Sequence, residues 1–365
     1  MKLNKIRSIA FYLPQYHPIP ENDQWWGRGF TEWRNVTKAA PLFTGHYQPH
    51  LPADLGFYDL RLSEILEEQA EMAGEYGIHG FMFYHYWFNG RRILETPINN
   101  YLKNQKPDFP FCLCWANENW SRNWDGQTND VLLKQEYGPD DDIHHMQYLC
   151  RNVFSDNRYI KINGKPIFAV YRTESFPDIK KTVEIWRNIA IKEGFPDLYL
   201  IRVESFIGGI DPVSIGFDAS IEFQPDWNNL PRRLRPSFSD KFISFFNNSI
   251  PALESNHVFL YKDLIKAALS KPAPTYKRFP GITPMWDNTS RRKNNSYIFH
   301  DSHPELFSQW LEEIINRFKP FSQEENFIFI NAWNEWAEGC HLEPCLKWAN
   351  GYLKAVQNKV LNNQK

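Results

Sequence analysis

Eight short apolar runs recur along the 365-residue chain, and longer segments of mixed polarity separate them. The runs are residues 9–13, 80–84, 111–115, 167–171, 199–203, 219–223, 282–286 and 327–332. Runs of this length predict buried strands. Strands that alternate with helices form parallel sheets, so eight such units predict an α/β protein folded as a single (β/α)8 TIM barrel. A doubly wound open sheet is the alternative, but no glycine-rich phosphate-binding turn follows the first run.

Several of the intervening segments have the pattern of amphipathic helices. Residues 302–318 begin with Ser302 and Glu305 in capping-box spacing and continue with an apolar stripe. Residues 60–76 show the same stripe, and another begins at Ile179. These segments supply the helices that a barrel requires.

One domain accounts for nearly the whole chain. We expect the barrel to span residues 1–358 and residues 359–365 to form a frayed tail. Two long connections, residues 18–59 and 225–278, follow the first and sixth predicted strands. Loops at the carboxyl ends of barrel strands form the functional face, so these two should wall a cleft.

Composition excludes some functions and favours another. The net charge is −2, whereas proteins that bind nucleic acid usually carry a basic excess, so we expect no nucleic-acid partner. Aromatic residues make up 16% of the chain, and many lie beside polar residues. Rings next to hydrogen-bonding groups suit the faces and hydroxyl edges of sugars, although large cores also use many rings.

The cysteines and the amino terminus indicate the compartment. The five cysteines are Cys112, Cys114, Cys150, Cys340 and Cys345. They form no zinc-type spacing and cannot all pair, which favours a reducing environment. The first apolar run stops at Pro14, too short for a signal-peptide core, and no stretch approaches a membrane span. We therefore expect a cytoplasmic protein with no transmembrane segment, and the sequence indicates neither a metal site nor a cofactor.

The strongest candidate for chemistry is FINAWNEWAEGCHLEP, where the last predicted strand ends. It carries Glu335 and Glu338, three residues apart, beside Trp333 and Trp336. Glycoside cleavage needs one carboxyl as acid and another as base or nucleophile, and apolar cover can separate two pKa values. A capping or ion-paired role for one Glu is the alternative. Their position at the end of a barrel strand favours catalysis by Glu335 and Glu338.

Polar and aromatic residues at the other strand ends, in the loops and beside the two acids are candidates for substrate binding. They are Tyr16, His17, Trp25, Trp26, His50, Asp54, His85, Tyr86, Trp115, Asn117, Glu118, Trp120, Glu204, Gln224, Trp286, Asp287, Asn334 and Trp336. Packing is the alternative role for the histidines and rings. Arg232, Arg233, Arg291 and Arg292 form two basic clusters that are either solvated faces or sites for a phosphate or an acidic sugar.

Several long motifs then carry a family resemblance. They are AFYLPQYHPIPENDQWWGRGFTEW, GHYQPHLPADLGFYDLR, GIHGFMFYHYWFNGRR, FCLCWANENWSRNWDG, GITPMWDNTSRR and FINAWNEWAEGCHLEP. In this order they resemble the WbsX-like glycosyltransferases of bacterial surface-polysaccharide clusters, over almost the whole chain. The resemblance implies a role in making O-antigen lipopolysaccharide or capsule.

A narrower likeness connects the N-E-W-x-E-G element and the segment around residues 46–59 with family-99 glycoside hydrolases, which include endo-α-mannosidases. That resemblance implies a retaining reaction through an anhydrosugar. In it Glu335 acts as base on the 2-hydroxyl of the sugar, and Glu338 acts first as acid and later as base.

Two enzyme functions and one binding function follow as expectations. The first is glycosyl transfer in polysaccharide assembly on an oligosaccharide or lipid-linked glycan. The second is endo-acting hydrolysis of an α-mannoside-like linkage. A non-catalytic glycan-binding barrel is the third, and it would not require the paired acids. The sequence leaves the sugar, the linkage and the oligomeric state open.

Overall fold

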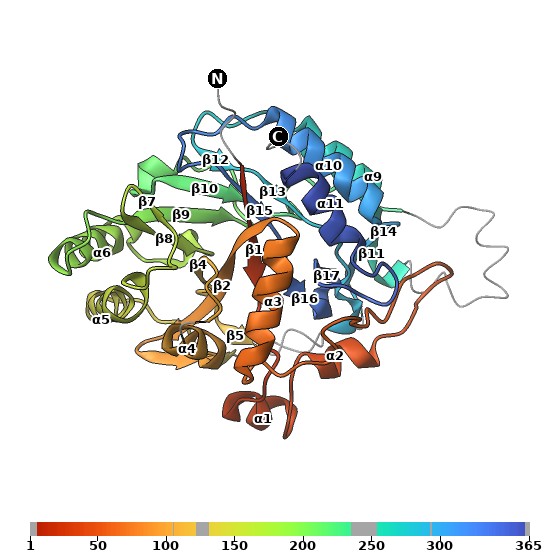
Figure 1. Ribbon diagram of the computed structural model, residues 1–365, viewed down its shortest axis with the longest axis horizontal. Coiled ribbons are helices and arrows are strands. Elements are labelled where there is room, and N and C mark those ends of the chain that lie inside the picture. Colours follow the sequence, from red (N-terminus) through yellow and green to blue (C-terminus); the bar gives the residue numbers. More distant parts are fainter. Residues whose placement is uncertain (1–5, 105, 122–130, 235–253, 293, 362–365) are drawn as a thin grey trace.

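A parallel barrel forms the centre of the protein (Figure 1). The computed structural model describes residues 6–104, 106–121, 131–234, 254–292 and 294–361. The barrel strands are β1 (Arg7–Tyr12), β2 (Ile78–Phe88), β4 (Phe111–Trp115), β8 (Lys165–Val170), β9 (Tyr199–Glu204), β10 (Ala219–Glu222), β12 (Arg278–Phe279), β13 (Gly281–Ile282) and β15 (Phe327–Ile330). Their neighbour order is β12-β10-β9-β8-β4-β2-β1-β15-β13. The predicted (β/α)8 fold is confirmed.

The barrel closes at Pro280. β12 pairs with β10 on one side, and β13 pairs with β15 on the other. Because Pro280 has no N–H to donate, it interrupts the strand and divides it into two short pieces, β12 and β13. The Pro280 carbonyl still accepts the backbone N–H of Phe329 at 3.0 Å. β12 and β13 therefore act together as the seventh strand.

Helices surround the barrel (Figure 1). They are α3 (Ser63–Glu75), α4 (Thr96–Lys103), α5 (Pro139–Leu149), α6 (Ile179–Lys192), α9 (Tyr261–Ser270), α10 (Pro304–Arg317) and α11 (Gly351–Val360). The helices predicted over residues 60–76, from Ile179 and over 302–318 are present. The capping box is not: the residue before α10 is His303, and it makes no side-chain cap.

Two predicted strand ends were wrong by four residues. β2 continues to Phe88 because it folds back in an antiparallel pair with β3 (Arg91–Ile93). The seventh strand ends at Ile282 rather than at residue 286. Pro284 cannot extend a ladder, and the Thr283 hydroxyl donates instead to the Met285 carbonyl at 2.8 Å.

The two long loops contain ordered elements. The first holds α1 (Pro20–Trp26) and α2 (Trp33–Lys38). The second holds β11 (His257–Leu260), which pairs with β14 (Tyr297–His300), while its residues 235–253 lie outside the described chain. Three further strand pieces are β5 (Trp120–Ser121), β6 (Val131–Leu133) and β7 (Lys161–Ile162). α11 runs two residues into the predicted tail, and residues 362–365 are not described.

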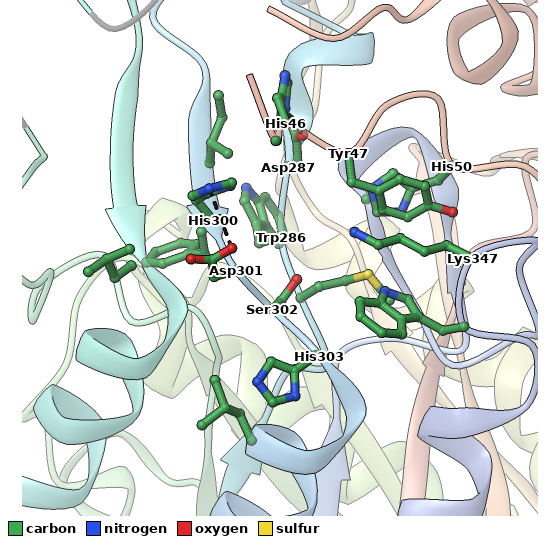
Figure 2. Close-up of a pocket in the computed structure, with 18 of the residues that line it drawn as sticks. His46, Tyr47, His50, Trp286, Asp287, His300, Asp301, Ser302, His303 and Lys347 are labelled. Carbon is green, nitrogen blue, oxygen red and sulfur yellow. Dashed lines mark hydrogen bonds and ion pairs between the residues drawn. The ribbon is translucent and has the colours of Figure 1, made fainter. Parts of the chain in front are cut away.

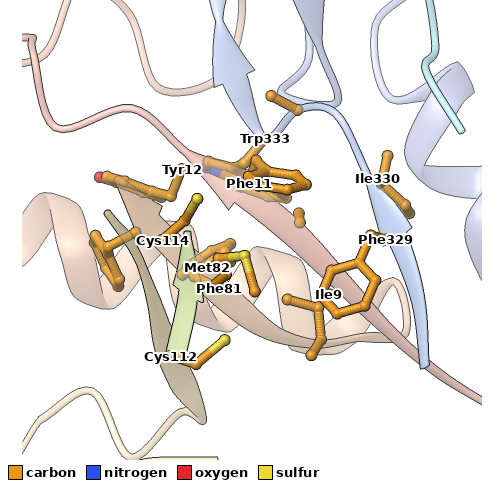
Figure 3. Close-up of a cluster of buried hydrophobic side chains, with 14 of the residues drawn as sticks. Ile9, Phe11, Tyr12, Phe81, Met82, Cys112, Cys114, Phe329, Ile330 and Trp333 are labelled. Atoms are coloured by element: carbon orange, nitrogen blue, oxygen red, sulfur yellow. The ribbon is translucent and has the colours of Figure 1, made fainter. Parts of the chain in front are cut away.

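Phe11 fills the barrel interior. Its ring centre lies 5.6 Å from that of Tyr84, 5.9 Å from Phe223 and 6.2 Å from Phe329, so it touches side chains from three sides of the barrel. Figure 3 shows it among the buried residues of the neighbouring strands. Burial of such a ring contributes about 2–3 kcal/mol. Because Tyr84 and Phe223 also line the cleft described below, this layer forms the floor of the cleft.

The five cysteines are all buried and unpaired. Cys112 and Cys114 lie on β4 within the core (Figure 3). None of the helices within the described ranges has both the length and the apolar character needed to cross a membrane.

Gly281 provides a test of the closure. A Cβ at this position would lie 1.8 Å from the Glu222 carbonyl oxygen, which is part of the neighbouring strand. We expect Gly281→Ala to lower the free energy of unfolding by about 2–3 kcal/mol because the backbone itself must move. Urea denaturation measures this change.

The matched control is Gly74→Ala in α3. There a Cβ would lie 3.6 Å from Phe109, an ordinary contact, and alanine favours the helix by up to about 1 kcal/mol. Equal effects of the two substitutions would contradict the proposed closure.

Candidate active site

The backbone on both sides of Glu335 is fixed to the end of β1. The Asn334 side chain accepts the Leu13 N–H at 2.7 Å and donates to the Leu13 carbonyl at 3.0 Å. The Tyr16 hydroxyl donates to the Asn334 carbonyl at 2.8 Å and accepts the Trp336 N–H at 3.0 Å. Tyr16 and Asn334, both predicted to bind substrate, therefore position Glu335 in the structure.

The turn that follows brings Glu338 to the same place. β16 (Asn334–Glu335) and β17 (Cys340–His341) pair across a short helical turn, Trp336–Glu338. Gly339 ends this turn with φ = 55°, a left-handed conformation that favours glycine.

Arg291 lies between three carboxylates. Its guanidinium is 2.6 Å from Glu338, 3.1 Å from Glu32 and 3.3 Å from Glu335. The Arg291 side chain is 10% exposed, and that of Glu32 is fully buried. This guanidinium was a predicted anion site, but its donors meet carboxylates of the protein itself. The cluster is acidic overall.

Glu32 is the member of this cluster that the sequence did not predict. It immediately precedes α2, and its carbonyl accepts the backbone N–H groups of Asn35 and Val36. The next residue, Trp33, packs on Trp336 with ring centres 5.7 Å apart. The sequence signal that could have identified Glu32 is its position as an acidic residue within an aromatic stretch of the first long loop.

The two candidate catalytic acids differ in charge environment. Burial, followed by repulsion from Glu338, raises the pKa of Glu335 to about 8. Burial also raises the pKa of Glu338, but its contact with Arg291 is shorter and its side chain keeps 22% exposure. Within the pair the proton therefore favours Glu335 and the negative charge favours Glu338.

A cavity of about 210 Å³ opens over these acids. Predicted residues that line it are Trp26, Tyr86, Glu118, Trp120, Arg291, Glu335 and Glu338. The other residues that line it are Gln15, Asn22, Tyr84, Ala116, Asn119, Ser121, Leu132, Tyr171 and Phe223. We call this cavity the cleft. Rings and amides around two carboxyl groups form a composition that suits a sugar.

Gln15 and Asn22 present unused hydrogen-bonding groups. Gln15 is 2% exposed and Asn22 is fully buried. The amide nitrogen of Gln15 and both polar side-chain atoms of Asn22 have no partner among the described residues. Buried polar groups normally have partners, so these atoms are suited to substrate hydroxyls.

Glu118 lies at the side of the cleft. Its carboxylate meets the Arg172 guanidinium at 3.0 Å, and burial raises its pKa. Glu118 also lines a neighbouring cavity together with Asn117. Trp25 packs edge-on against Trp120 at 5.5 Å, next to the lining residues.

Other predicted residues lie away from the cleft, inside the fold. His85 contacts His145 at 2.9 Å, and burial lowers its pKa to about 3. His17 is buried, with a pKa lowered to about 4 for the same reason. The Trp115 indole donates to the Trp87 carbonyl at 3.2 Å.

Three more of the predicted substrate-binding residues form polar contacts within the protein. The Trp336 indole donates to Glu343 at 2.6 Å. Glu204 accepts from the Tyr276 hydroxyl at 2.7 Å. Gln224 accepts the N–H of Asp226 at 3.1 Å.

The remaining predicted residues line other parts of the surface. His50, Trp286 and Asp287 line another cavity, and Asp54 lines a separate one. Arg232, Arg233 and Arg292 do not line the cleft. Within the described ranges, no three His, Cys, Asp or Glu side chains are grouped as metal ligands.

Arg291→Met tests the importance of the cluster. Removal of the guanidinium leaves three carboxyl groups buried without a cation, so we expect a loss of about 3 kcal/mol in the free energy of unfolding at neutral pH. Glu32→Gln in the same chain should recover part of that loss because one carboxylate is removed. Urea denaturation of the single and double variants measures both effects.

Arg317→Met is the control because its ion pair with Glu313 is exposed and should change stability by less than about 0.5 kcal/mol. A similar small effect at Arg291 would contradict the account of the cluster.

Comparison with solved structures shows the same fold. A glycoside hydrolase-like protein aligns with a TM-score of 0.60 and 13% identity over 99% of this chain and 95% of its own. A GH99 endo-alpha-mannosidase from Bacteroides thetaiotaomicron aligns with a TM-score of 0.58 and 15% identity over 98% of this chain and 97% of its own. The chain is therefore similar to glycoside-hydrolase barrels in architecture.

Sequence comparison extends over almost the same length. Two proteins of Xanthomonas campestris pv. campestris, both called Uncharacterized protein WxcX, are 40% identical over 359 residues. The match covers 96% of this chain and 49% of each relative. The chain therefore spans about half the length of these curated relatives. Residues 8–356 match the family described as Glycosyltransferase WbsX. With this match over nearly its full length, the chain belongs to the WbsX glycosyltransferase family.

Proposed function

We propose that this chain is a carbohydrate-active enzyme that transfers glycosyl units during assembly of a bacterial surface polysaccharide. The observation that carries the proposal is the position of Glu335 and Glu338 at the mouth of the barrel, beside Arg291 and within a cleft of rings and amides. Family membership supports a carbohydrate-active enzyme. The substrate proposed is an oligosaccharide or lipid-linked glycan.

Each acid has a proposed role. Glu335 removes the proton from the sugar 2-hydroxyl, whose oxygen then attacks C1 and expels the leaving group as an anhydrosugar forms. Glu338 gives a proton to the leaving oxygen and later takes one from the acceptor that opens the anhydrosugar, while Glu335 returns its proton to the 2-oxygen as the bond from that oxygen to C1 breaks. Arg291 is a positioning residue because it contacts both carboxylates. Gln15 and Asn22 would hold sugar hydroxyls.

The proton must move from Glu335 to Glu338 for these roles. Glu335 holds a proton more tightly than an ordinary carboxyl, with a pKa near 8, yet a base must be ionised. A sugar that enters and donates hydrogen bonds to Glu335 would stabilise its charged form. Glu338 must gain the proton that Glu335 gives up.

Hydrolysis is the second candidate function, and one observation favours it. The barrel architecture is that of glycoside hydrolases, including an endo-alpha-mannosidase. The same two carboxyl groups serve hydrolysis if water, rather than a sugar hydroxyl, opens the intermediate. The distinction depends on which acceptor enters the cleft.

Product analysis separates the two functions. The purified protein is incubated with free and lipid-linked oligosaccharides, with and without nucleotide sugars, and products are identified by mass. Growth of a glycan supports transfer, and shortening without a donor supports hydrolysis. No change in any glycan would contradict an enzymatic role and favour a glycan-binding barrel.

Substitution of either acid should abolish this turnover. We expect Glu335→Gln and Glu338→Gln each to lower kcat by about 100-fold to 10,000-fold because each removes a proton-transfer group. Glycan binding, measured by calorimetry, should persist in both variants. Glu313→Gln, on the exposed side of α10, is the matched control. Full activity in both variants would refute catalysis by the pair.

The pH dependence tests whether the pair shares one proton. The proposed reaction needs one proton on the two carboxyls, so kcat/KM should fall as pH rises through about 8, where the pair loses the proton that Glu338 must donate. A profile that keeps rising with pH through the same region would contradict the shared proton. A substrate without a 2-hydroxyl should not react, and turnover of that substrate would refute the anhydrosugar route.

A further inference from the structure

A second cavity lies beside the cleft, and the mechanism above does not use it. Its volume is about 400 Å³, within the range of small-molecule sites. We call it the side cavity; Figure 2 shows its walls. The backbone N–H of Asp287, which lines the side cavity, donates to the carbonyl of Glu338, which lines the cleft, at 2.7 Å. Gly339, the next residue, lines the side cavity, so one turn of chain separates the two sites.

An unused donor lies in the wall of the side cavity. Trp286 is 5% exposed, and its indole nitrogen has no partner among the described residues. In Figure 2 that nitrogen points away from the Trp286 backbone toward the space beside His300. A buried indole N–H without a partner indicates a hydrogen bond that a ligand can complete.

Opposite charges face each other across the cavity. In Figure 2 Asp301 projects from one wall and Lys347 from the other, with Ser302 below them. Asp301 contacts His300 at 3.4 Å, while the Lys347 ammonium lies over the rings of Tyr47 and Trp348 at 4.3 and 4.7 Å. A carboxylate that accepts and an ammonium that donates can both bind the hydroxyl groups of one sugar ring.

The charges of the lining residues balance. His46 Nδ1 accepts the N–H of Leu42 at 3.0 Å, so its Nε2 carries a proton toward Asp287 at 2.6 Å. Burial lowers the pKa of His50 to about 4 and also lowers the pKa of His300, which leaves both uncharged at neutral pH.

The lysines Lys262 and Lys347 are matched by the carboxylates of Asp287 and Asp301. This balance favours a neutral ligand, because a charged ligand of either sign would leave the cavity with an uncompensated charge.

We propose that the side cavity is a second carbohydrate site, which binds one or two neutral sugar rings of the glycan on which the cleft acts. This proposal rests on the proposed glycan substrate, but it concerns binding and does not require turnover. The Trp286 N–H, the Asp301 carboxylate and the Lys347 ammonium supply the polar contacts, and the rings of Tyr47 and Trp286 supply flat apolar surface. A glycan held here would be kept close to the cleft across a single turn.

Binding is measured with sugars of known charge. The probes are methyl α-mannoside, methyl β-galactoside, methyl N-acetyl-β-glucosaminide and maltose, with methyl glucuronide and glucose 1-phosphate as anionic counterparts. Saturation-transfer NMR and titration use the full-length chain with Glu335→Gln and Glu338→Gln together, so that turnover is suppressed. At least one neutral probe should bind, and it should bind more tightly than either anionic probe.

Substitutions in the cavity locate that binding. Trp286→Phe keeps the ring but removes the donor, and we expect affinity for the bound probe to fall at least tenfold. Asp301→Asn and Lys347→Met alter exposed side chains that the fold does not need, and each should weaken binding at least threefold. Lys354→Met, an exposed lysine of α11 outside the lining, is the matched control and should have no effect.

Three results would overturn the second site. They are unchanged affinity in all three cavity variants, tighter binding of the anionic probes in the cavity, or no binding of any neutral probe. Each is independent of the proposed function, which is tested by glycan turnover in the wild-type protein. Turnover with no binding in the side cavity would refute this inference alone.

Discussion

The contact of one guanidinium with three carboxylates is the interaction on which the candidate site depends. Arg291 joins Glu32 from the first long loop to Glu335 and Glu338 after the last strand. Three acids so close together would repel one another without it, and full burial of Glu32 makes that repulsion costly. The guanidinium thus ties the wall of the cleft to its base.

This arrangement also explains why two similar acids can act differently. Glu338 meets Arg291 at the shorter distance and its side chain is 22% exposed, whereas the Glu335 side chain is only 8% exposed. The first environment stabilises charge, and the second stabilises a proton. A substrate that replaces the missing solvent around Glu335 can reverse that order, so the pair is able to exchange one proton during a reaction.

The sequence predicted the barrel well because periodicity is a local property. β4 runs over residues 111–115, as its apolar run predicted. His85 shows where local reading fails: β2 extends beyond it, so His85 is a mid-strand residue that packs on His145 from α5 instead of facing a substrate.

Contacts between residues far apart in the sequence are the other feature of the site that the sequence could not predict. Glu32 and Arg291 are 259 residues apart, and no pattern within either segment indicates that they meet. Gln15 and Asn22 came into the cleft for the same reason: the fold, rather than the composition of their segments, brings them there. By contrast, Glu335 and Glu338 lie in one short motif at the end of a strand, so their shared location could be inferred directly.

The most direct measurement is a titration of the glutamate carboxyl carbons by carbon-13 NMR, with the Glu335 signal assigned by its loss in Glu335→Gln. We predict that this carboxyl titrates near pH 8 in the protein without added substrate, because burial and repulsion from Glu338 outweigh the Arg291 guanidinium 3.3 Å away. A midpoint below about 5, as for an ordinary glutamate, would contradict it. Arg291 would then hold both acids ionised, and the proposed proton exchange between them would be lost.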